Sequence, residues 1–221
     1  MVTNLTTYFF QKSVTETTFL KSYVHMTTFN DQDCIQKILE GDIQKFSILV
    51  NQYKDLVYTL ALRMCKNKEE AEEVSQDTFI KVYKSLNTFK NESKFSTWLY
   101  RIAYNTCLDN LRKNKRQQQT VSIDEFTENQ LKTLDNIFET MEQEERKQTI
   151  QNCLQRLPSE DNFLLTLYYF EELSLNEISK IINAKPNYVK VKLYRSRKRL
   201  TSILKEKIAP EIIEQYEYKN G

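Results

Sequence analysis

Glycine is nearly absent from this chain of 221 residues: only Gly41 and Gly221 occur, with three prolines. Tight β-hairpins and phosphate-binding loops depend on glycine, because glycine adopts backbone conformations that other residues avoid. The scarcity argues against β-sandwiches, P-loop nucleotide sites and dinucleotide-binding folds. We therefore predict an all-α fold, and the length allows one large domain or two small ones with cores of their own.

Clustered metal ligands are also missing. His25 is the only histidine, and Cys34, Cys65, Cys107 and Cys153 are far apart, with no Cys-x-x-Cys pair. Structural zinc usually needs clustered Cys and His ligands, so we expect no metal and no other cofactor. The thiols are expected to stay reduced, as in a cytoplasmic protein.

Long hydrophobic runs are absent as well. No segment approaches 18 consecutive apolar residues, so we expect no membrane insertion. The first 25 residues lack the basic start and apolar run of a signal peptide, which favours a cytoplasmic location. Ordered patterning begins just after Met26, so residues 1–28 are expected to be a disordered extension, and translation starts at either Met1 or Met26.

Charge is abundant and unevenly distributed, although the net charge is only +2. Arg101–Arg116 has five basic residues against one acidic residue, and Lys185–Lys207 has nine against one. Between them, Asp124–Glu145 has eight carboxylates against one lysine. Two cationic segments separated by an acidic one predict contact with a polyanion at two separate points.

Apolar residues at helical spacing predict two groups of helices. The first group comprises residues 31–40, 42–65, a helix capped by Asn67 with Val74, Thr78, Val82 and Leu86 on its buried face, a loop at 89–94, and residues 96–113. The second comprises residues 144–156, 159–170, 175–182 and 187–207. Residues 117–143 lose the periodicity and gain carboxylates, which predicts a flexible acidic linker between two small domains, 29–116 and 144–207, with a tail at 208–221.

The strongest local signal is the segment Leu173–Ile178. Ser174 is placed to cap a helix and Glu177 to bind back to it, as in a capping box. Asn183 is among the few non-glycine residues tolerated in a left-handed turn, and it ends this short helix. A short helix, a tight turn and a basic helix together predict a helix-turn-helix, whose second helix enters the major groove.

A helical wheel divides that second helix into two faces. The core face holds Val189, Leu193, Leu200 and Leu204, and the opposite face holds Val191, Tyr194, Arg195 and Lys198. Val191, apolar among cations, suits a thymine methyl, and Arg195 suits a guanine edge or a phosphate. Four further cations are expected to flank the DNA backbone: Lys190, Lys192, Arg197 and Arg199. Charge alone leaves open a solvated basic helix without a ligand.

The first basic helix carries a second stripe, formed by Trp98, Arg101, Asn105, Arg112 and Arg116. Cations beside aromatic rings are typical of proteins that hold single-stranded nucleic acid, and Phe95, Tyr100 and Tyr104 accompany Trp98. Aromatic residues at helical spacing more often belong to the core. We favour core packing for Trp98 and Phe95.

Two blocks of this sequence resemble one known family. Ala71–Phe79 (AEEVSQDTF) and Phe95–Asn105 (FSTWLYRIAYN), followed by Asp109 and Arg112, closely resemble region 2 of extracytoplasmic-function (group IV) sigma factors of the sigma-70 family. Leu157-Pro158, Leu173–Ile178 (LSLNEI) and Tyr194–Arg197 (YRSR) resemble region 4 of the same family. The resemblance covers about residues 29 to 204.

The resemblance implies an alternative sigma factor, without enzymatic activity, that directs core RNA polymerase to promoters and promotes initiation. The expected partners are the β′ clamp helices and β flap of core polymerase, promoter DNA and an anti-sigma factor. The implied polymerase-binding residues are Glu73, Gln76, Asp77 and Lys81. The implied minus 10 contacts are Lys90, Asn91, Lys94, Arg101, Asn105, Arg112 and Arg116, and the minus 35 contacts are Lys190, Val191, Tyr194, Arg195 and Lys198. The acidic linker resembles the segment that threads the RNA channel of polymerase.

Departures from the family pattern affect the expected promoter sequence more than the fold. Asn187-Tyr188-Val189 stands where family members often carry Gly-Thr-Val, and Val191 occupies a usual Ser or Arg position. The main alternative is a conventional helix-turn-helix regulator that uses residues 29–116 for sensing or dimerisation. A nucleic-acid enzyme such as a recombinase is a third hypothesis, but no cluster of nucleophile and carboxylates stands out.

Overall fold

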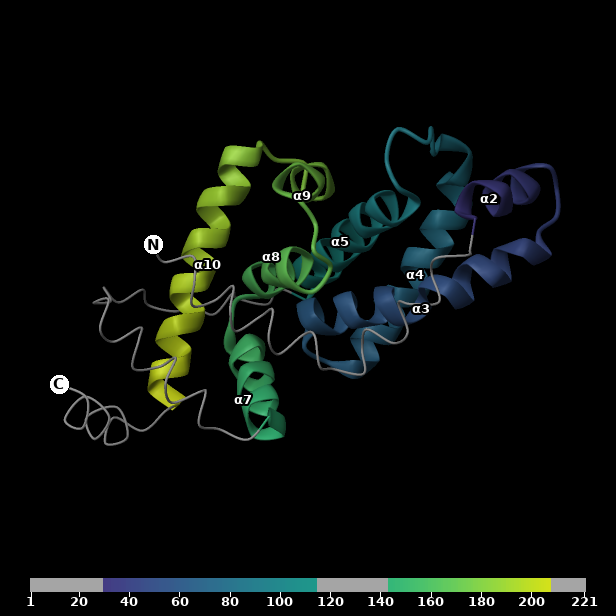
Figure 1. The fold of residues 1–221 in the computed structure, drawn as a ribbon. Helices are drawn as coiled ribbons and strands as arrows, with labels where there is room; N and C mark the ends of the chain where they lie inside the picture. The colour runs from purple at the N-terminus through teal and green to yellow at the C-terminus, as the bar shows by residue number, and fades with distance from the viewer. Residues whose placement is uncertain (1–29, 115–142, 208–221) are drawn as a thin grey trace, which may run out of the picture. The chain divides into compact units, whose positions relative to one another are not determined.

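The computed structural model describes residues 30–114 and 143–207, and every element in these two segments is a helix (Figure 1). The predicted all-α fold is confirmed. The expected extension at 1–28, the linker up to residue 142 and the tail at 208–221 lie outside the described residues, so the domain bounds stay a prediction. The chain forms two compact units. One holds the helices up to residue 114 together with residues 173–189, and the other holds the remaining described helices.

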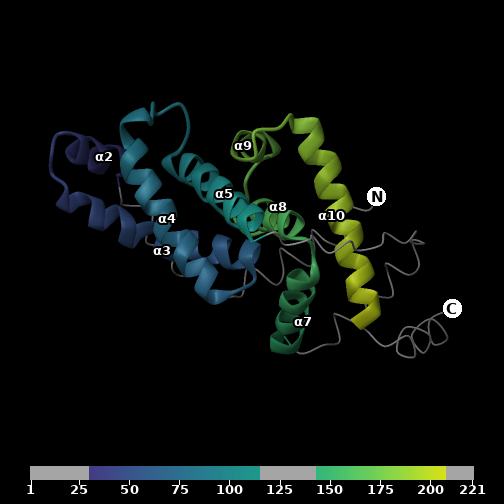
Figure 2. The ribbon, with the colours of Figure 1, turned by 180° about the vertical axis from the view of Figure 1, so that it is seen from behind.

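The first unit contains α2 (Asp31–Leu39), α3 (Gln44–Cys65), α4 (Lys68–Ser85), the short 3₁₀ helix η2 (Leu86–Thr88) and α5 (Phe95–Lys113). Figures 1 and 2 show α3, α4 and α5 side by side, and these three helices contact one another. Their core includes Leu49, Val57, Leu60, Met64, Leu99 and Ala103. The predicted buried face of α4 is confirmed, since Val74, Thr78, Val82 and Leu86 are all buried.

Local signals set the ends of these helices. The Asn67 side chain accepts a hydrogen bond from the Glu70 backbone N–H at 2.9 Å, which caps α4 as predicted. Lys66, at φ 58°, ends α3 in the left-handed conformation. Gly41, at φ 110°, turns the chain after α2 in a region that side chains disfavour.

Residues 173–189 contain α9 (Leu175–Ile181) and the start of α10 (Pro186–Lys207). The predicted capping box is present, because Ser174 and Glu177 bind each other's backbone N–H groups. Asn183 has φ 53°, and the Ala184 N–H donates to the Ser179 carbonyl at 2.9 Å to close the turn. The predicted succession of short helix, tight turn and basic helix is therefore confirmed.

The second unit contains α7 (Gln143–Arg156), α8 (Ser159–Tyr169) and α10 from Lys190 onward. Its core includes Cys153, Leu154, Phe163, Leu164, Leu167, Leu193 and Leu200. The Asn162 amide donates to the Leu154 carbonyl at 3.0 Å and joins α8 to α7. One core position was predicted wrongly: Leu204 is only half-buried, and the neighbouring Ile203 is buried instead.

Candidate nucleic-acid interface

The outward face of α10 presents an apolar and aromatic strip among cations. Val191 and Tyr194 are 49% and 43% exposed, and Arg195 is exposed beside them. The Lys198 ammonium lies 5.3 Å from the centre of the Tyr194 ring, a cation–π contact that holds the cation on this face. Val189, Leu193 and Leu200, on the predicted core face, are almost completely buried. Burial thus confirms the predicted separation of faces, whereas contact with DNA stays a prediction.

Tyr188 at the start of α10 is 54% exposed, and Lys190 is also exposed. Tyr188 lies three residues before Val191, so its ring extends the outward strip by one helical turn. No contact was predicted for Tyr188 from the sequence. The predicted helix, 187–207, already included this residue, and its spacing of three from Val191 was the signal that places it on this face.

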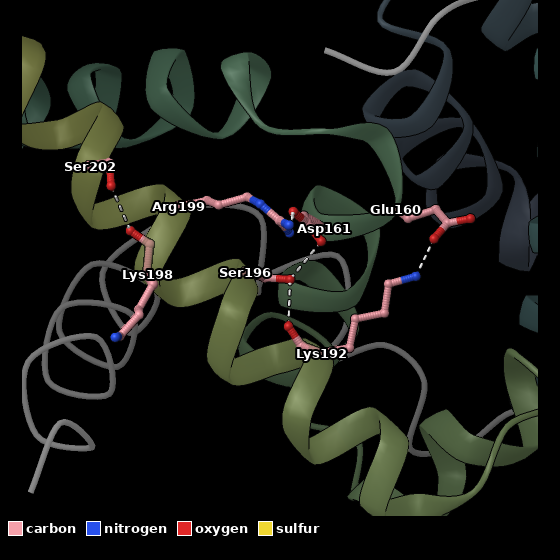
Figure 3. Close-up of polar contacts among 7 residues, drawn as sticks. All are labelled: Glu160, Asp161, Lys192, Ser196, Lys198, Arg199 and Ser202. Carbon is pink, nitrogen blue, oxygen red and sulfur yellow. Dashed lines mark hydrogen bonds and ion pairs between the residues drawn. The ribbon is translucent and has the colours of Figure 1, made fainter. Parts of the chain in front are cut away.

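Three cations of α10 are turned toward α8 instead. Figure 3 shows Lys192 pairing with Glu160 and Arg199 reaching Asp161. The Arg197 guanidinium lies over the rings of Tyr168 and Tyr169, at 5.4 and 5.5 Å from their centres. Lys192, Arg197 and Arg199 were expected to flank the DNA backbone. Each of them has its contact on α8, so these positions argue against that expectation, and their role toward DNA stays a prediction.

The loop between η2 and α5 carries exposed polar side chains above an aromatic cluster. Lys90, Asn91 and Lys94 are exposed, and Asn91 has φ 57°, which turns the backbone sharply. Beneath them, the Phe95 ring lies 5.5 Å from Phe89 and 5.7 Å from Trp98, measured between ring centres. Such contacts give the loop a rigid base.

On α5 itself, Arg101, Asn105 and Arg112 are exposed as predicted, and Arg116 lies outside the described residues. Phe95, Tyr100 and Tyr104 are buried, so their rings are not available to stack on exposed bases. Core packing is confirmed for Phe95. Trp98 packs on Phe89 and Phe95 yet is only half-buried, so part of its ring stays at the surface.

Tyr53 links α3 to this aromatic base and to α2. Its ring lies 5.3 Å from that of Phe95, and its hydroxyl lies 2.9 and 2.8 Å from the two carboxylate oxygens of Asp31. Burial raises the pKa of Asp31, and the hydrogen bond from Tyr53 opposes this rise. The carboxylate was not identified from the sequence, because its partner is 22 residues away.

The exposed face of α4 holds the four residues expected to bind polymerase: Glu73, Gln76, Asp77 and Lys81. A pocket between α4 and α5 is lined by three of these four, all but Gln76, and also by Asp109 and Arg112. Asp109 pairs at 3.5 Å with both Lys81 and Arg112, so it joins the residues assigned to polymerase to those assigned to DNA.

Two apolar residues on this side of α4 were missed. Ile80 is 50% exposed and Tyr83 is 44% exposed, and the Tyr83 ring packs edge-on against Phe46 at 5.0 Å. They follow Gln76 at spacings of four and seven residues, which places all three on one helical face. The wheel of α4 contained this signal, because Ile80 and Tyr83 fall outside the stripe of Val74, Thr78 and Val82.

In the described part of the chain, no cluster of three or more His, Cys, Asp or Glu side chains is arranged to hold a metal ion. Nor is any helix among those residues long and apolar enough to cross a membrane.

The sequence matches the family model of sigma-70 region 2 over residues 49–117 and that of sigma-70 region 4 over residues 147–200. It is 34% identical over 178 residues to the ECF RNA polymerase sigma factor SigW of Bacillus subtilis, covering 78% of this chain and 95% of that protein. It is 31% identical over 185 residues to the RNA polymerase sigma-H factor of Pseudomonas aeruginosa, covering 81% and 96%. The chain belongs to the extracytoplasmic-function sigma factors.

Solved structures show the same fold. The structure of CnrH in complex with the cytosolic domain of CnrY has a TM-score of 0.55 at 19% identity, covering 80% of this chain and 97% of that one. The sigma factor RpoE of Bartonella quintana, in complex with the anti-sigma factor NepR, has a TM-score of 0.50 at 18% identity and covers 73% and 98%. The resemblance seen in the sequence is confirmed, and this sigma factor belongs to a family that directs RNA polymerase and is not a class of enzymes.

Proposed function

We propose that this sigma factor acts in the cytoplasm, without catalysis of its own, by placing core RNA polymerase on promoters through three separate surfaces. The observation that carries the proposal is the presence, in order on one chain, of regions 2 and 4. A conventional helix-turn-helix regulator would not need the first of these. The chain by itself is not expected to open the promoter duplex, so its activity depends on core enzyme.

The polymerase surface is the exposed face of α4, with the β′ clamp helices as its partner. Its polar residues are Glu73, Gln76, Asp77 and Lys81, and Ile80 and Tyr83 add apolar area. Exposed apolar side chains framed by charges are typical of a protein interface, where the apolar centre loses water and the rim sets orientation. The second unit is expected to bind the β flap.

The minus 10 surface combines the loop residues Lys90, Asn91 and Lys94 with Arg101, Asn105 and Arg112 of α5, and Arg116 is assigned to the same surface. Exposed cations beside the open edge of Trp98 suit an unpaired strand, because cations follow phosphates and a ring stacks on a base. The minus 35 surface is the outward face of α10, where Val191 and Tyr194 give shape and Lys190, Arg195 and Lys198 give charge.

An anti-sigma factor is the expected negative regulator. The structural neighbours CnrH and RpoE were each solved with a bound protein, CnrY and NepR. A partner that covers the α4 face and the outward face of α10 would block polymerase and DNA together.

Run-off transcription with core polymerase tests the proposal. Promoter fragments from the chain's own genome are transcribed by core enzyme with and without the full-length chain, and transcripts of defined length are expected only with it. If the chain binds DNA tightly yet directs no initiation from any fragment, it acts as a conventional regulator instead. Val191→Ser is then expected to change the preferred minus 35 sequence while core binding stays at the wild-type level. A loss of core binding would show that Val191 is misassigned.

A further inference from the structure

A buried carboxylate joins α8 to α10 in the second unit. The Asp161 side chain is only 3% exposed, and each of its oxygens has a partner on α10 (Figure 3). The Ser196 hydroxyl lies 2.8 Å from one oxygen, and Arg199 Nη1 donates to the other at 2.6 Å. A buried carboxylate without partners would be strongly unfavourable, so this arrangement ties α10 to one position.

These contacts fix the rotation of α10 about its own axis as well as its distance from α8. Lys192, Ser196 and Arg199 follow one another at spacings of four and three residues, so they form one stripe of α10. This stripe lies roughly 120° around the helix from the centre of the outward strip, at about 100° per residue. Apolar packing tolerates small rotations, whereas hydrogen bonds from two residues to one carboxylate do not.

Two cations of α10 belong to this stripe and therefore do not lie on the outward face. Arg199 is 26% exposed in its side chain and Lys192 is 21% exposed, each paired with an acidic residue of the first turn of α8. Lys198, by contrast, points away from Asp161 in Figure 3 and lies over the Tyr194 ring.

We propose that Asp161 is a positioning residue for promoter recognition: it fixes the rotation of α10 and, together with Glu160, withholds Arg199 and Lys192 from DNA. On the outward face, phosphate contact is then left to Lys190, Arg195 and Lys198. This inference rests on the proposed function of α10 as the minus 35 reader.

The first test counts phosphate contacts. Binding of holoenzyme to a fluorescein-labelled promoter duplex is measured in closed complexes over a range of salt concentrations. The charge-neutral pairs Asp161→Leu with Arg199→Met and Glu160→Gln with Lys192→Gln are expected to keep the wild-type slope of log K against log salt. Lys198→Gln is expected to reduce the slope by about 0.9, as for one lost phosphate contact. A reduction of that size in either neutral pair would show that Arg199 or Lys192 touches DNA and would overturn the proposal.

The second test separates positioning from stability. Affinity is compared between the promoter duplex and one with a single minus 35 base pair replaced, a change that typically weakens binding by about 5- to 150-fold. Asp161→Leu with Arg199→Met fills the same space with apolar groups, so it is expected to fold, yet its discrimination is expected to fall several-fold. Asp161→Asn with Arg199→Gln retains the hydrogen-bonding groups and is expected to discriminate as wild type does.

The outcomes distinguish two failures. If wild-type holoenzyme itself does not discriminate between the duplexes, the assignment of α10 to the minus 35 element is wrong. If wild type discriminates and the Leu/Met pair discriminates equally well, only the positioning role of Asp161 is wrong. Should the Leu/Met pair fail to fold, the salt slopes of the Asn/Gln pair and of the Glu160–Lys192 pair still decide whether these cations contact DNA.

Discussion

The capping box at the start of α9 is expected to control the stability of that helix. The Ser174 hydroxyl accepts the Glu177 N–H at 3.2 Å and donates to the Glu177 carboxylate at 2.7 Å, and the same carboxylate oxygen accepts the Ser174 N–H at 2.9 Å. A helix of seven residues has few internal hydrogen bonds, so its ends matter more than in a long helix. Ser174→Ala removes both bonds of the hydroxyl.

The expected cost is about 1 kcal/mol, within the range of roughly 0.5 to 2 kcal/mol for replacing an N-cap serine by alanine. A free energy of opening lowered by that amount accelerates amide exchange about fivefold when exchange proceeds through local opening. Hydrogen exchange with mass spectrometry on the full-length chain measures this directly. The peptide covering Leu175–Ile181 is expected to exchange about five times faster, while a peptide from α3 exchanges at the wild-type rate.

The pH dependence provides a second measure. The hydrogen bond from the Ser174 hydroxyl, and then that from its backbone N–H, hold the pKa of Glu177 below its ordinary value of 4.5. A carboxyl with a lowered pKa in the folded state stabilises that state above its ordinary pKa and loses the effect as the pH falls through the folded value. The difference between wild type and Ser174→Ala is therefore expected to shrink below about pH 4.5.

Glu177→Gln is the matched control, because glutamine still offers an acceptor oxygen but carries no charge. Its effect at neutral pH is expected to be smaller than that of Ser174→Ala. The opening free energy of this variant has no contribution from titration at residue 177, so its difference from wild type is also expected to shrink below about pH 4.5. Two results would refute the reasoning: unchanged exchange of α9 in Ser174→Ala at neutral pH, or equal acceleration of α9 and α3, which would indicate global rather than local opening.

Three further predictions concern the first unit and the core of the second. The double variant Gln76→Ala with Asp77→Ala is expected to bind core polymerase more weakly than wild type, without loss of helix content. The matched control, Asn51→Ala with Asp55→Ala on the exposed side of α3, is expected to keep wild-type affinity. Equal affinities of the two double variants would contradict the assignment of α4. Tyr53→Phe keeps the ring but removes the hydrogen bond to Asp31, so urea unfolding is expected to show a loss of about 1.5 to 3 kcal/mol. Because burial raises the pKa of Asp31 in the folded chain, its carboxyl gains a proton above its ordinary pKa of 3.8. This loss is therefore expected to shrink as the pH falls toward 3.8, and a pH-independent loss would argue against it. Burial raises the pKa of Cys153 to about 11. Iodoacetamide is therefore expected to leave this thiol unmodified in the folded chain at mildly alkaline pH and to alkylate it in urea. Modification in the folded state would contradict the burial of Cys153.

Helix positions were predictable because they depend on local chemistry. The predicted ends of α3 and α5 differ from the observed ones by at most two residues, since apolar spacing and capping residues act within a few positions. Asn183 shows the same principle: its tolerance of a positive φ is a property of the residue itself. The outward position of Val191 also followed from spacing alone.

Side-chain partners on a different helix were not predictable, because they depend on which helices pack together. Lys192 and Glu160 are 32 residues apart, and Arg199 and Asp161 are 38 residues apart. A wheel shows which cations share a stripe but not what faces that stripe. The error at Leu204 has a similar cause, since Ile203 lies only 100° away and the packing of α10 in its unit selects between the two.

The inward pairing changes what the charge of α10 means for DNA binding. Lys185–Lys207 has nine basic residues, which would release counterions from about nine phosphates if all of them reached DNA, giving a salt slope near −8. Lys192, Arg197 and Arg199 are turned toward α8 and its C-terminal end, so at most six remain for this role and the slope from this helix is expected to be no steeper than about −5. The net charge of the segment thus overstates its electrostatic contact with the duplex. Its base preference then rests on a small set of outward residues, held in place by a carboxylate that the DNA does not touch.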